Sequence, residues 1–242
     1  INSYTAFNHY DITEENEFER EDVVVESNTM TFEDYKKATM FRWVIMFAHY
    51  LGTVQYIARF TRKVKNIPYK EFYERLVNFI ERQEGTFLNT EFNITRKNID
   101  GVLAVEQPWG RIVPEVKENF AWDFEEATAI KIAKNQDQFY AEIRRFLVED
   151  IGYEEDEVLE ELIAYQIAAI IDPSVQYPTD NSYSYNIHQV IHKNTPLSKK
   201  EINLSFTAQN YNGDYYEWGK EILWWGRRVG ACKTKIEEMQ SI

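Results

Sequence analysis

The segment from Met40 to Leu51 constrains the fold most strongly, because its side chains are apolar on nearly every face of a helix. A helix without a broad polar face belongs in the middle of a bundle. Thr31 precedes the segment as a candidate N-cap, and Asp34 stands at the capping-box position. The segment contains Arg42 and is well short of the ~20 apolar residues of a membrane-spanning helix. The sequence therefore predicts a buried helix here and no membrane span.

Several other segments repeat apolar residues at the spacing of a helix. Pro68 and Gly85 suit the start and the stop of one of them. Asp123 followed by Glu126 is a second capping pattern, and Pro173 ends the last segment of this kind. The expected helices cover residues 53–65, 68–85, 123–150 and 154–172, whereas 86–119 holds only a short helix around 96–105 and loops.

The two ends of the chain differ from this helical part. Residues 1–30 are polar and acidic, which predicts an extended connector with a candidate edge strand at 23–25. After residue 173 we expect a tyrosine-rich loop and a short helix around His188, with His188 and His192 on one face. A strand follows in which Ile202, Leu204 and Phe206 alternate with polar residues, then a turn at Asn212-Gly213 and a final helix over 215–228.

These patterns predict a mainly α fold. We expect an irregular multi-helix bundle over 31–173, preceded by the connector 1–30. Residues 174–242 would form a small mixed α/β tail with one or two short strands, packed on the helical body.

Charge and cysteine content narrow the function classes. The formal net charge of −13 argues against nucleic acid as a partner, because a phosphate backbone repels such a surface. The single cysteine, Cys232, cannot form an internal disulfide or hold an iron–sulfur cluster. It favours a reducing compartment, so we expect a cytoplasmic protein. Since the chain starts with Ile1 and not with Met, we also expect it to be part of a longer protein.

No catalytic motif stands out, so the sequence leaves open whether the chain is an enzyme. His188 and His192 lie four residues apart, a spacing that metal sites use on helices. The residues between them are Gln-Val-Ile, and no third ligand can be named, so we predict no metal site. The many glutamate pairs are typical of solvated helix faces.

Two groups of residues are candidates for contact with a ligand or a partner. Trp224 and Trp225 precede Arg227 and Arg228 in the predicted last helix. The tryptophans suit the core and the arginines suit a helix C-terminus, or the group forms an anion or partner contact. In the tyrosine-rich segment, a stacking platform for sugars and a packed loop both remain open; its candidate residues are Tyr183 and Tyr185.

Several segments together resemble the C-terminal region of cobalamin-dependent radical S-adenosylmethionine proteins. That family commonly ends on a helix similar to "EILWWGRRVGA". The segments that carry the resemblance follow one another along most of the chain: "MTFEDYKKATMFRWVIMFAHYLGTVQYIARF" (30–60), "IPYKEFYERLVNFI" (67–80), "YPTDNSYSYNIHQVI" (177–191) and "PLSKKEINLSFTAQNYNGDYYEWGKEI" (196–222).

The chain also departs from that family. The family's iron–sulfur cluster motif, Cys-x-x-x-Cys-x-x-Cys, and its cobalamin-binding motif, Asp-x-His-x-x-Gly, are both absent from this sequence. The resemblance therefore implies the helical portion that follows the catalytic barrel, and no catalytic, cluster or cobalamin residue is carried over. It implies an iron–sulfur cluster, S-adenosylmethionine and cobalamin only in the other domains of a parent protein. The implied partners are that protein's own N-terminal barrel and cobalamin domains, and the implied chemistry is methyl transfer or related radical reactions.

Three hypotheses follow. The leading one is a non-catalytic accessory domain that caps the substrate entrance of such an enzyme, because radical intermediates must be shielded from water. The surface from Trp224 to Arg228 and the tyrosine-rich segment would make the contact. The alternatives are a free-standing helical binding or scaffold protein, and a carbohydrate-binding module that uses Tyr183 and Tyr185.

Overall fold

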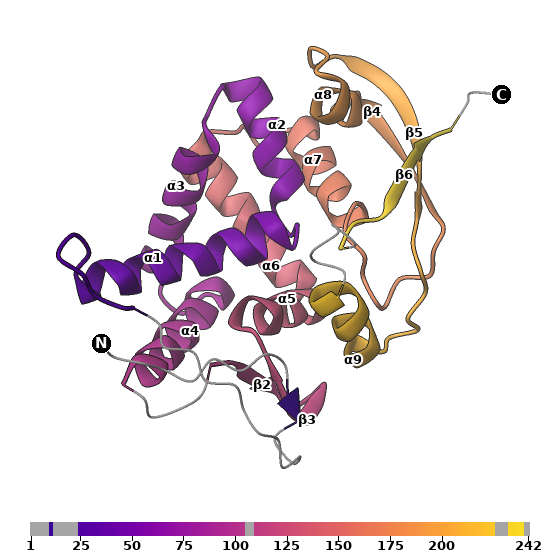
Figure 1. The fold of residues 1–242 in the computed structure, drawn as a ribbon. Helices are drawn as coiled ribbons and strands as arrows, with labels where there is room; N and C mark the ends of the chain where they lie inside the picture. Colours follow the sequence, from indigo (N-terminus) through magenta and orange to yellow (C-terminus); the bar gives the residue numbers. More distant parts are fainter. Residues whose placement is uncertain (1–9, 12–23, 105–108, 226–231, 240–242) are drawn as a thin grey trace.

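The structure, a computed structural model, describes residues 10–11, 24–104, 109–225 and 232–239. The described chain is mostly helical and contains two small antiparallel sheets, one at each side of the helical part (Figure 1). The helical elements are α1 (Phe32–Val44), η1 (Ile45–Tyr50), α2 (Gln55–Lys65), α3 (Tyr69–Arg82), α4 (Phe87–Leu103), α5 (Phe124–Lys134), α6 (Gln136–Phe146), η2 (Leu147–Ile151), α7 (Glu157–Ala168), α8 (Ile187–Lys193), α9 (Tyr215–Trp218) and η3 (Gly219–Trp225), where η marks a π-helix.

The strands form two sheets of three strands each. The first sheet has the order β1-β3-β2 and the second the order β4-β5-β6, with antiparallel neighbours in both. Their bounds are β1 (Tyr10–Asp11), β2 (Arg111–Val113), β3 (Lys117–Trp122), β4 (Thr179–Tyr185), β5 (Lys199–Thr207) and β6 (Lys235–Glu238).

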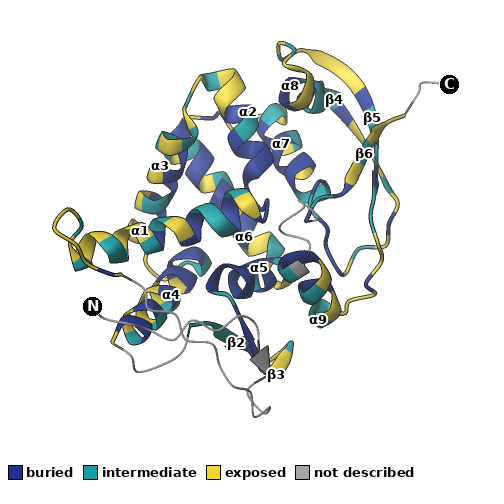
Figure 2. Ribbon diagram, viewed as in Figure 1, coloured by how far each residue is buried: buried dark blue, intermediate teal, exposed yellow. Residues whose placement is uncertain are grey.

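The apolar segment predicted as a buried helix forms α1 and its continuation η1. The Thr31 capping box is present, with the Thr31 side chain accepting from the Asp34 backbone N–H. Phe47 and Ala48 are fully buried, which confirms the prediction. Near the end of α1, Trp43 Nε1 donates to Thr128 Oγ1 of α5 over 3.2 Å. The helix α5 is itself buried along most of its length (Figure 2), so these two helices form the centre of the bundle.

Two helix predictions in the body need correction. The segment around 96–105 was expected to be a short helix, but α4 begins at Phe87. Its first backbone N–H groups, on Phe87 and Leu88, donate to the buried carboxylate of Glu142 over 2.6 and 2.9 Å. Thr86 also caps this helix locally, because its Oγ1 accepts from the Asn89 N–H over 3.2 Å, whereas the contribution of Glu142 leaves no local pattern in the sequence. The predicted long helix over 123–150 is divided at Asn135 into α5 and α6, although its Asp123 capping box is confirmed.

The region after α4 was expected to form loops, and this expectation is wrong for residues 111–113 and 117–122. These residues form β2 and β3, with β1 pairing on the other edge of β3. The alternation that would have revealed β3 is missing, because its first half is exposed and its last three residues, Phe120 to Trp122, are all buried. At the candidate edge strand, Val24 and Val25 lie outside any strand, and residue 23 lies outside the described residues.

The C-terminal tail contains more sheet than predicted. The strand with Ile202, Leu204 and Phe206 on its buried face is confirmed as β5. The tyrosine-rich segment, expected to be a loop, is instead strand β4 on one edge of β5, and β6 pairs with the other edge. Glu161 of α7 holds β4 in place, because its carboxylate accepts from the backbone N–H groups of Ser184 and Tyr185 over 2.6 and 3.0 Å.

The tail packs on the helical body through a shared core. Tyr183 and Phe206 belong to the same buried cluster as the residues of α1, α2 and α7. The helix α7 lies between α2 and the sheet β4-β5-β6 (Figure 1). The predicted turn at Asn212-Gly213 is present, with positive φ at both residues. The last helix follows it as α9 and η3 and is described as far as Trp225.

Candidate functional site

The predicted contact residues of the last helix lie beside the first sheet. The Trp224 ring is half-buried, and its centroid lies 6.0 Å from that of Phe120 on β3. Trp225 ends η3, and Arg227 and Arg228 lie outside the described residues. Core packing and partner contact therefore both remain predictions for these residues. The half-buried Trp224 is compatible with either one.

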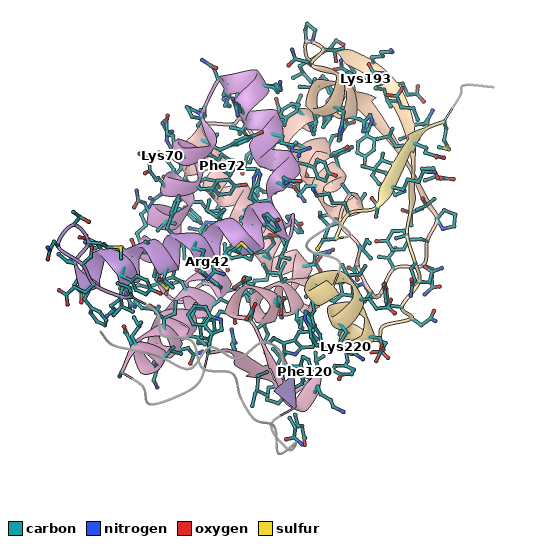
Figure 3. The ribbon with its side chains drawn as sticks, viewed as in Figure 1. Arg42, Lys70, Phe72, Phe120, Lys193 and Lys220 are labelled. Atoms are coloured by element: carbon teal, nitrogen blue, oxygen red, sulfur yellow. The ribbon has the colours of Figure 1, made fainter. Side chains whose placement is uncertain are left out.

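An aromatic face surrounds Trp224, and we define it by Phe120, Tyr216 and Trp224. Phe120 packs against Tyr216 at 5.5 Å between ring centroids. Lys117 Nζ lies 5.3 Å and Lys220 Nζ 5.1 Å from the centroid of the Tyr216 ring. Figure 3 shows Phe120 and Lys220 close together where β3 meets η3. Phe120 itself is buried, so the open part of this patch consists of the half-buried rings of Tyr216 and Trp224 with the two ammonium groups. This combination suits contact with another protein surface.

The two tyrosines predicted as contacts have different environments. Tyr183 has only 4% of its surface exposed, because its position in β4 turns it inward against Tyr165. Its assignment as a surface contact is therefore corrected to a core position. Tyr185 is half-buried, and Lys199 Nζ lies 5.5 Å from the centroid of its ring. A shallow depression of about 380 Å³ lies over these strands, but the ring of Tyr183 has no open face for stacking on a sugar.

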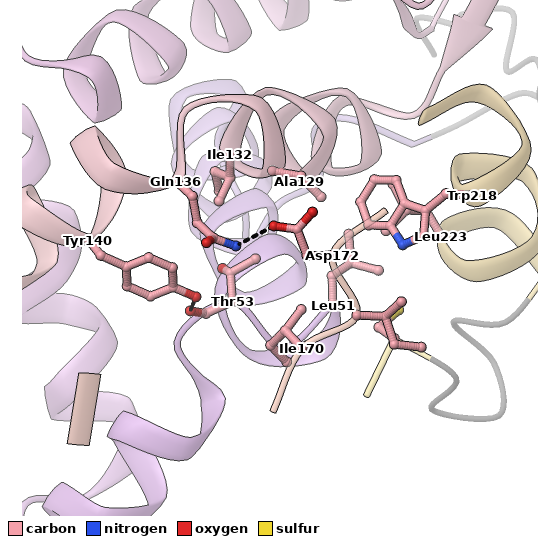
Figure 4. A pocket seen from close by; sticks show the side chains of 13 residues that line it. Leu51, Thr53, Ala129, Ile132, Gln136, Tyr140, Ile170, Asp172, Trp218 and Leu223 are labelled. Atoms are coloured by element: carbon pink, nitrogen blue, oxygen red, sulfur yellow. Dashed lines mark hydrogen bonds between the residues drawn. The ribbon is translucent and has the colours of Figure 1, made fainter. Parts of the chain in front are cut away.

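A small cavity lies between α5, α6 and the start of the tail (Figure 4). Its volume of about 20 Å³ is room for about one water molecule and not for a substrate. The buried carboxylate of Asp172 accepts hydrogen bonds from Gln136 Nε2 at 3.1 Å and from the backbone N–H and the hydroxyl of Ser174. These hydrogen bonds provide the carboxylate with partners, so we interpret the cavity as a packing gap between the helical body and the tail.

A cationic cluster forms where η1, α2 and α8 approach the start of β6. We define it by Arg59, Lys233, His49 and His192. Burial, then the positive charge of Arg59, lowers the pKa of Lys233. Burial, then Arg59 and Lys233, also lowers the pKa of His49. Partial desolvation, then the charges of His188, Arg59 and Lys233, lowers the pKa of His192 to about 4, although this imidazole is exposed at the surface of α8. The positive charge of Arg59 thus acts on Lys233, His49 and His192. The ring of Tyr56 joins two members of the cluster, because its centroid lies 5.8 Å from the guanidinium carbon of Arg59 and 5.7 Å from the ring centroid of His192.

His188 and His192, predicted to share one helix face, do so on α8. Their ring centroids lie 4.5 Å apart. The buried hydroxyl of Tyr165 lies 2.9 Å from His188 Nδ1 and 3.1 Å from His192 Nε2, so this tyrosine fixes both rings. The other ring nitrogen of His188, Nε2, lies 4.0 Å from Glu238 Oε1. Within the described part of the chain, no three His, Cys, Asp or Glu side chains are placed to hold a metal ion.

The residues do not fit the iron–sulfur cluster that the resemblance implies for a parent protein. An iron–sulfur cluster needs several thiolates, whereas Cys232 is the one cysteine of the chain. Cys232 is buried, and its Sγ lies 3.3 Å from the carbonyl oxygen of Ile222. We therefore derive no step of chemistry through a cluster in this chain.

Sequence reasoning missed the cationic cluster. A signal for part of it is present, because "RFTRKVK" at 59–65 contains four basic residues and no acid. The other members lie far apart along the chain, in η1, in α8 and before β6. Only the packing of α2 against α7 and α8 brings them together.

Comparison with known proteins gives one similarity to report. The chain is 23% identical over 219 residues to the 2-(S-pantetheinyl)-carbapenam-3-carboxylate methyltransferase of Streptantibioticus cattleyicolor. The alignment covers 84% of this chain and 32% of that protein, so the chain spans about a third of the length of the relative. No family model matches the chain.

Proposed function

We propose that this chain is a non-catalytic C-terminal accessory domain of a larger, cobalamin-dependent radical S-adenosylmethionine methyltransferase. One observation carries the proposal: most of this chain aligns with only a third of a methyltransferase. The family resemblance of the sequence, which places the same segments after a catalytic barrel, supports it. The iron–sulfur cluster, S-adenosylmethionine and cobalamin would belong to the other domains, whose chemistry is methyl transfer.

In this proposal the domain covers the substrate entrance of the barrel. A cap that excludes water protects reactive intermediates from side reactions. The contact surface would be the aromatic face with Trp225, Arg227, Arg228 and Tyr185, because ring surfaces and basic groups are enriched in interfaces. The partners are the protein's own barrel and cobalamin domains, and the proposed compartment is the cytoplasm. Among the described helices, none is long and apolar enough to cross a membrane.

The first experiment compares the full-length protein with a variant that ends before Thr31. If the domain is a cap, the shortened enzyme consumes S-adenosylmethionine with much less methylated product per molecule consumed. Unchanged turnover and unchanged stability of the shortened enzyme would rule out the cap.

A second experiment tests the surface in the full-length protein by charge reversal. Lys117→Glu with Lys220→Glu should weaken the coupling between S-adenosylmethionine consumption and methyl transfer. Lys63→Glu with Lys70→Glu is the matched control with the same change in charge, because both lysines are exposed, Lys63 on α2 and Lys70 on α3, and Lys70 lies away from the aromatic face (Figure 3). An equal effect of both changes would show that total charge, and not this surface, is responsible.

A further inference from the structure

Arg59 and Lys233 differ from the other basic groups of the described chain in their surroundings. Many arginines there pair with carboxylates, for example Arg82 with Asp150, Arg111 with Glu91 and Arg144 with Glu160. Within the described residues, neither Arg59 nor Lys233 forms an ion pair, although the chain carries 40 acidic residues. Both are half-buried, so solvent screens their mutual repulsion only in part. The fold thus holds two positive charges, those of Arg59 and Lys233, without an acidic partner among the described residues.

The backbone on both sides of Lys233 is anchored to the end of α7. The carbonyl of Cys232 accepts from the Ile171 N–H over 3.2 Å, and the Thr234 N–H donates to the carbonyl of Ala169 over 3.1 Å. Gly52 makes room for this arrangement, since an added Cβ would lie 2.8 Å from Ile170 Cδ1 and 3.9 Å from Lys233 Cε. The Lys233 backbone is therefore held in place by the fold.

Arg59 is positioned with similar firmness on α2. The start of this helix is fixed to α7 by the buried Gln166, whose Oε1 accepts from the Tyr56 N–H over 2.8 Å. The guanidinium carbon of Arg59 lies 5.8 Å from the centroid of the Tyr56 ring. No described side chain accepts a hydrogen bond from this guanidinium. Its N–H groups match the paired oxygens of a carboxylate or phosphate.

We propose that the cationic cluster of Arg59, Lys233, His49 and His192 binds an oxyanion, namely a carboxylate or phosphate group of a small molecule. The anion supplies the counter-charge that Arg59 and Lys233 lack among the described residues, and it removes the repulsion between these two charged groups. His192 takes up a proton when the anion binds and then donates to it, since a nearby negative charge favours the charged imidazole. The inference does not depend on the proposed function, because the four residues lie within this chain.

The test titrates the 242-residue chain with inorganic phosphate and, separately, with succinate, at an ionic strength held constant with sodium chloride. NMR follows the imidazole resonances of His49 and His192. We expect saturable shifts with at least one of the two anions and a higher pKa of His192 in its presence. Saturation with phosphate alone would show that the site prefers a phosphate group, and saturation with succinate alone would show that it prefers a carboxylate group. Either result supports the proposed site.

Single substitutions distinguish binding at this site from a general effect of the protein's positive charge. Arg59→Gln and Lys233→Gln should each weaken binding by about tenfold or more, which is the loss expected for a charge-assisted hydrogen bond. Arg62→Gln removes the same charge three residues further along α2, where Arg62 stacks on Tyr69, and should leave the affinity within about twofold. Without oxyanion, Arg59→Gln should be at least as resistant to urea as the wild type, because repulsion is removed. Absence of saturation with both anions, or an equal loss in Arg62→Gln, would overturn the proposal.

Discussion

Gln166 shows how much a single buried side chain contributes to this fold. Its amide oxygen accepts from the backbone N–H groups of Tyr56 and Ile57, and its Nε2 donates to the carbonyl of Gly52 over 2.9 Å. All of these groups are buried, so no water can replace the amide. One residue of α7 thus caps the start of α2 and fixes the chain reversal before it.

We therefore expect Gln166→Leu to destabilise the chain by about 3 kcal/mol, since each buried polar group without a partner is costly. Urea unfolding followed by circular dichroism measures this loss. Gln209→Leu serves as the control, because the exposed Gln209 bonds only the surface carboxylate of Glu221; its effect should stay within about 0.5 kcal/mol. Equal effects of the two variants would contradict the role assigned to Gln166.

The imidazole of His192 gives a prediction for pH. The imidazole is exposed, but partial desolvation and then the neighbouring positive groups lower its pKa to about 4 in the folded chain, against 6.5 when unperturbed. The unfolded chain therefore binds more protons between these values, and the free energy of unfolding falls as the pH drops from 6.5 to 4. Urea unfolding in chloride buffers should show a smaller fall over this range for His192→Asn. An NMR titration with a midpoint near 6.5 for His192 would refute the prediction.

At the scale of elements, the contact between α9–η3 and the first sheet depends on one glycine. A Cβ at Gly219 would lie 2.6 Å from Cη2 of Trp122, which is fully buried. We expect Gly219→Ala to destabilise the chain by about 1–3 kcal/mol, because the indole must shift in a packed core. Thermal unfolding measures the change, with the exposed Glu217→Ala as the control in the same helix. Unchanged stability of Gly219→Ala would show that the helix and the sheet are not in this close contact.

The elements that the sequence predicted are those with local signals. The capping boxes at Thr31 and Asp123 and the left-handed glycines at 85 and 152 act within a few residues of the helix ends that they define. The start of α4 depends on Glu142, and the strand β4 depends on Glu161, both from distant helices. The bonds from Glu142 and Glu161 leave no local pattern, and this explains why β4 was predicted as a loop. The helix α4 was predicted too short although Thr86 is a local N-cap signal, which the prediction overlooked.

The candidate site was predictable only in part for the same reason. The sequence singled out the face of His188 and His192 and the Trp224 segment, and the structure places the two histidines together and Trp224 on the aromatic face. Arg59 and Lys233 lie in segments that are 174 positions apart in the numbering, so no spacing rule connects them. Their proximity arises from tertiary packing alone.

For the whole molecule, the shared core predicts that body and tail unfold together. Phe206 of the tail is fully buried, and its ring centroid lies 6.1 Å from that of Tyr165 on α7. Phe206→Ala should destabilise the chain by about 3–5 kcal/mol in one cooperative transition. Val64→Ala, at a position 43% exposed on α2, should change the stability by less than about 0.5 kcal/mol. Two separate transitions would instead support the sequence-based division at residue 173.

The central claim is that this domain docks on the catalytic barrel of its parent protein through the aromatic face. Hydrogen–deuterium exchange of the 242-residue chain, alone and within the full-length protein, tests the contact most directly. We expect slower exchange in the full-length protein for Lys117–Trp122 and Gly219–Trp225, and no change for the outer helix Tyr69–Arg82. Identical exchange of the first two segments in both proteins would contradict the account.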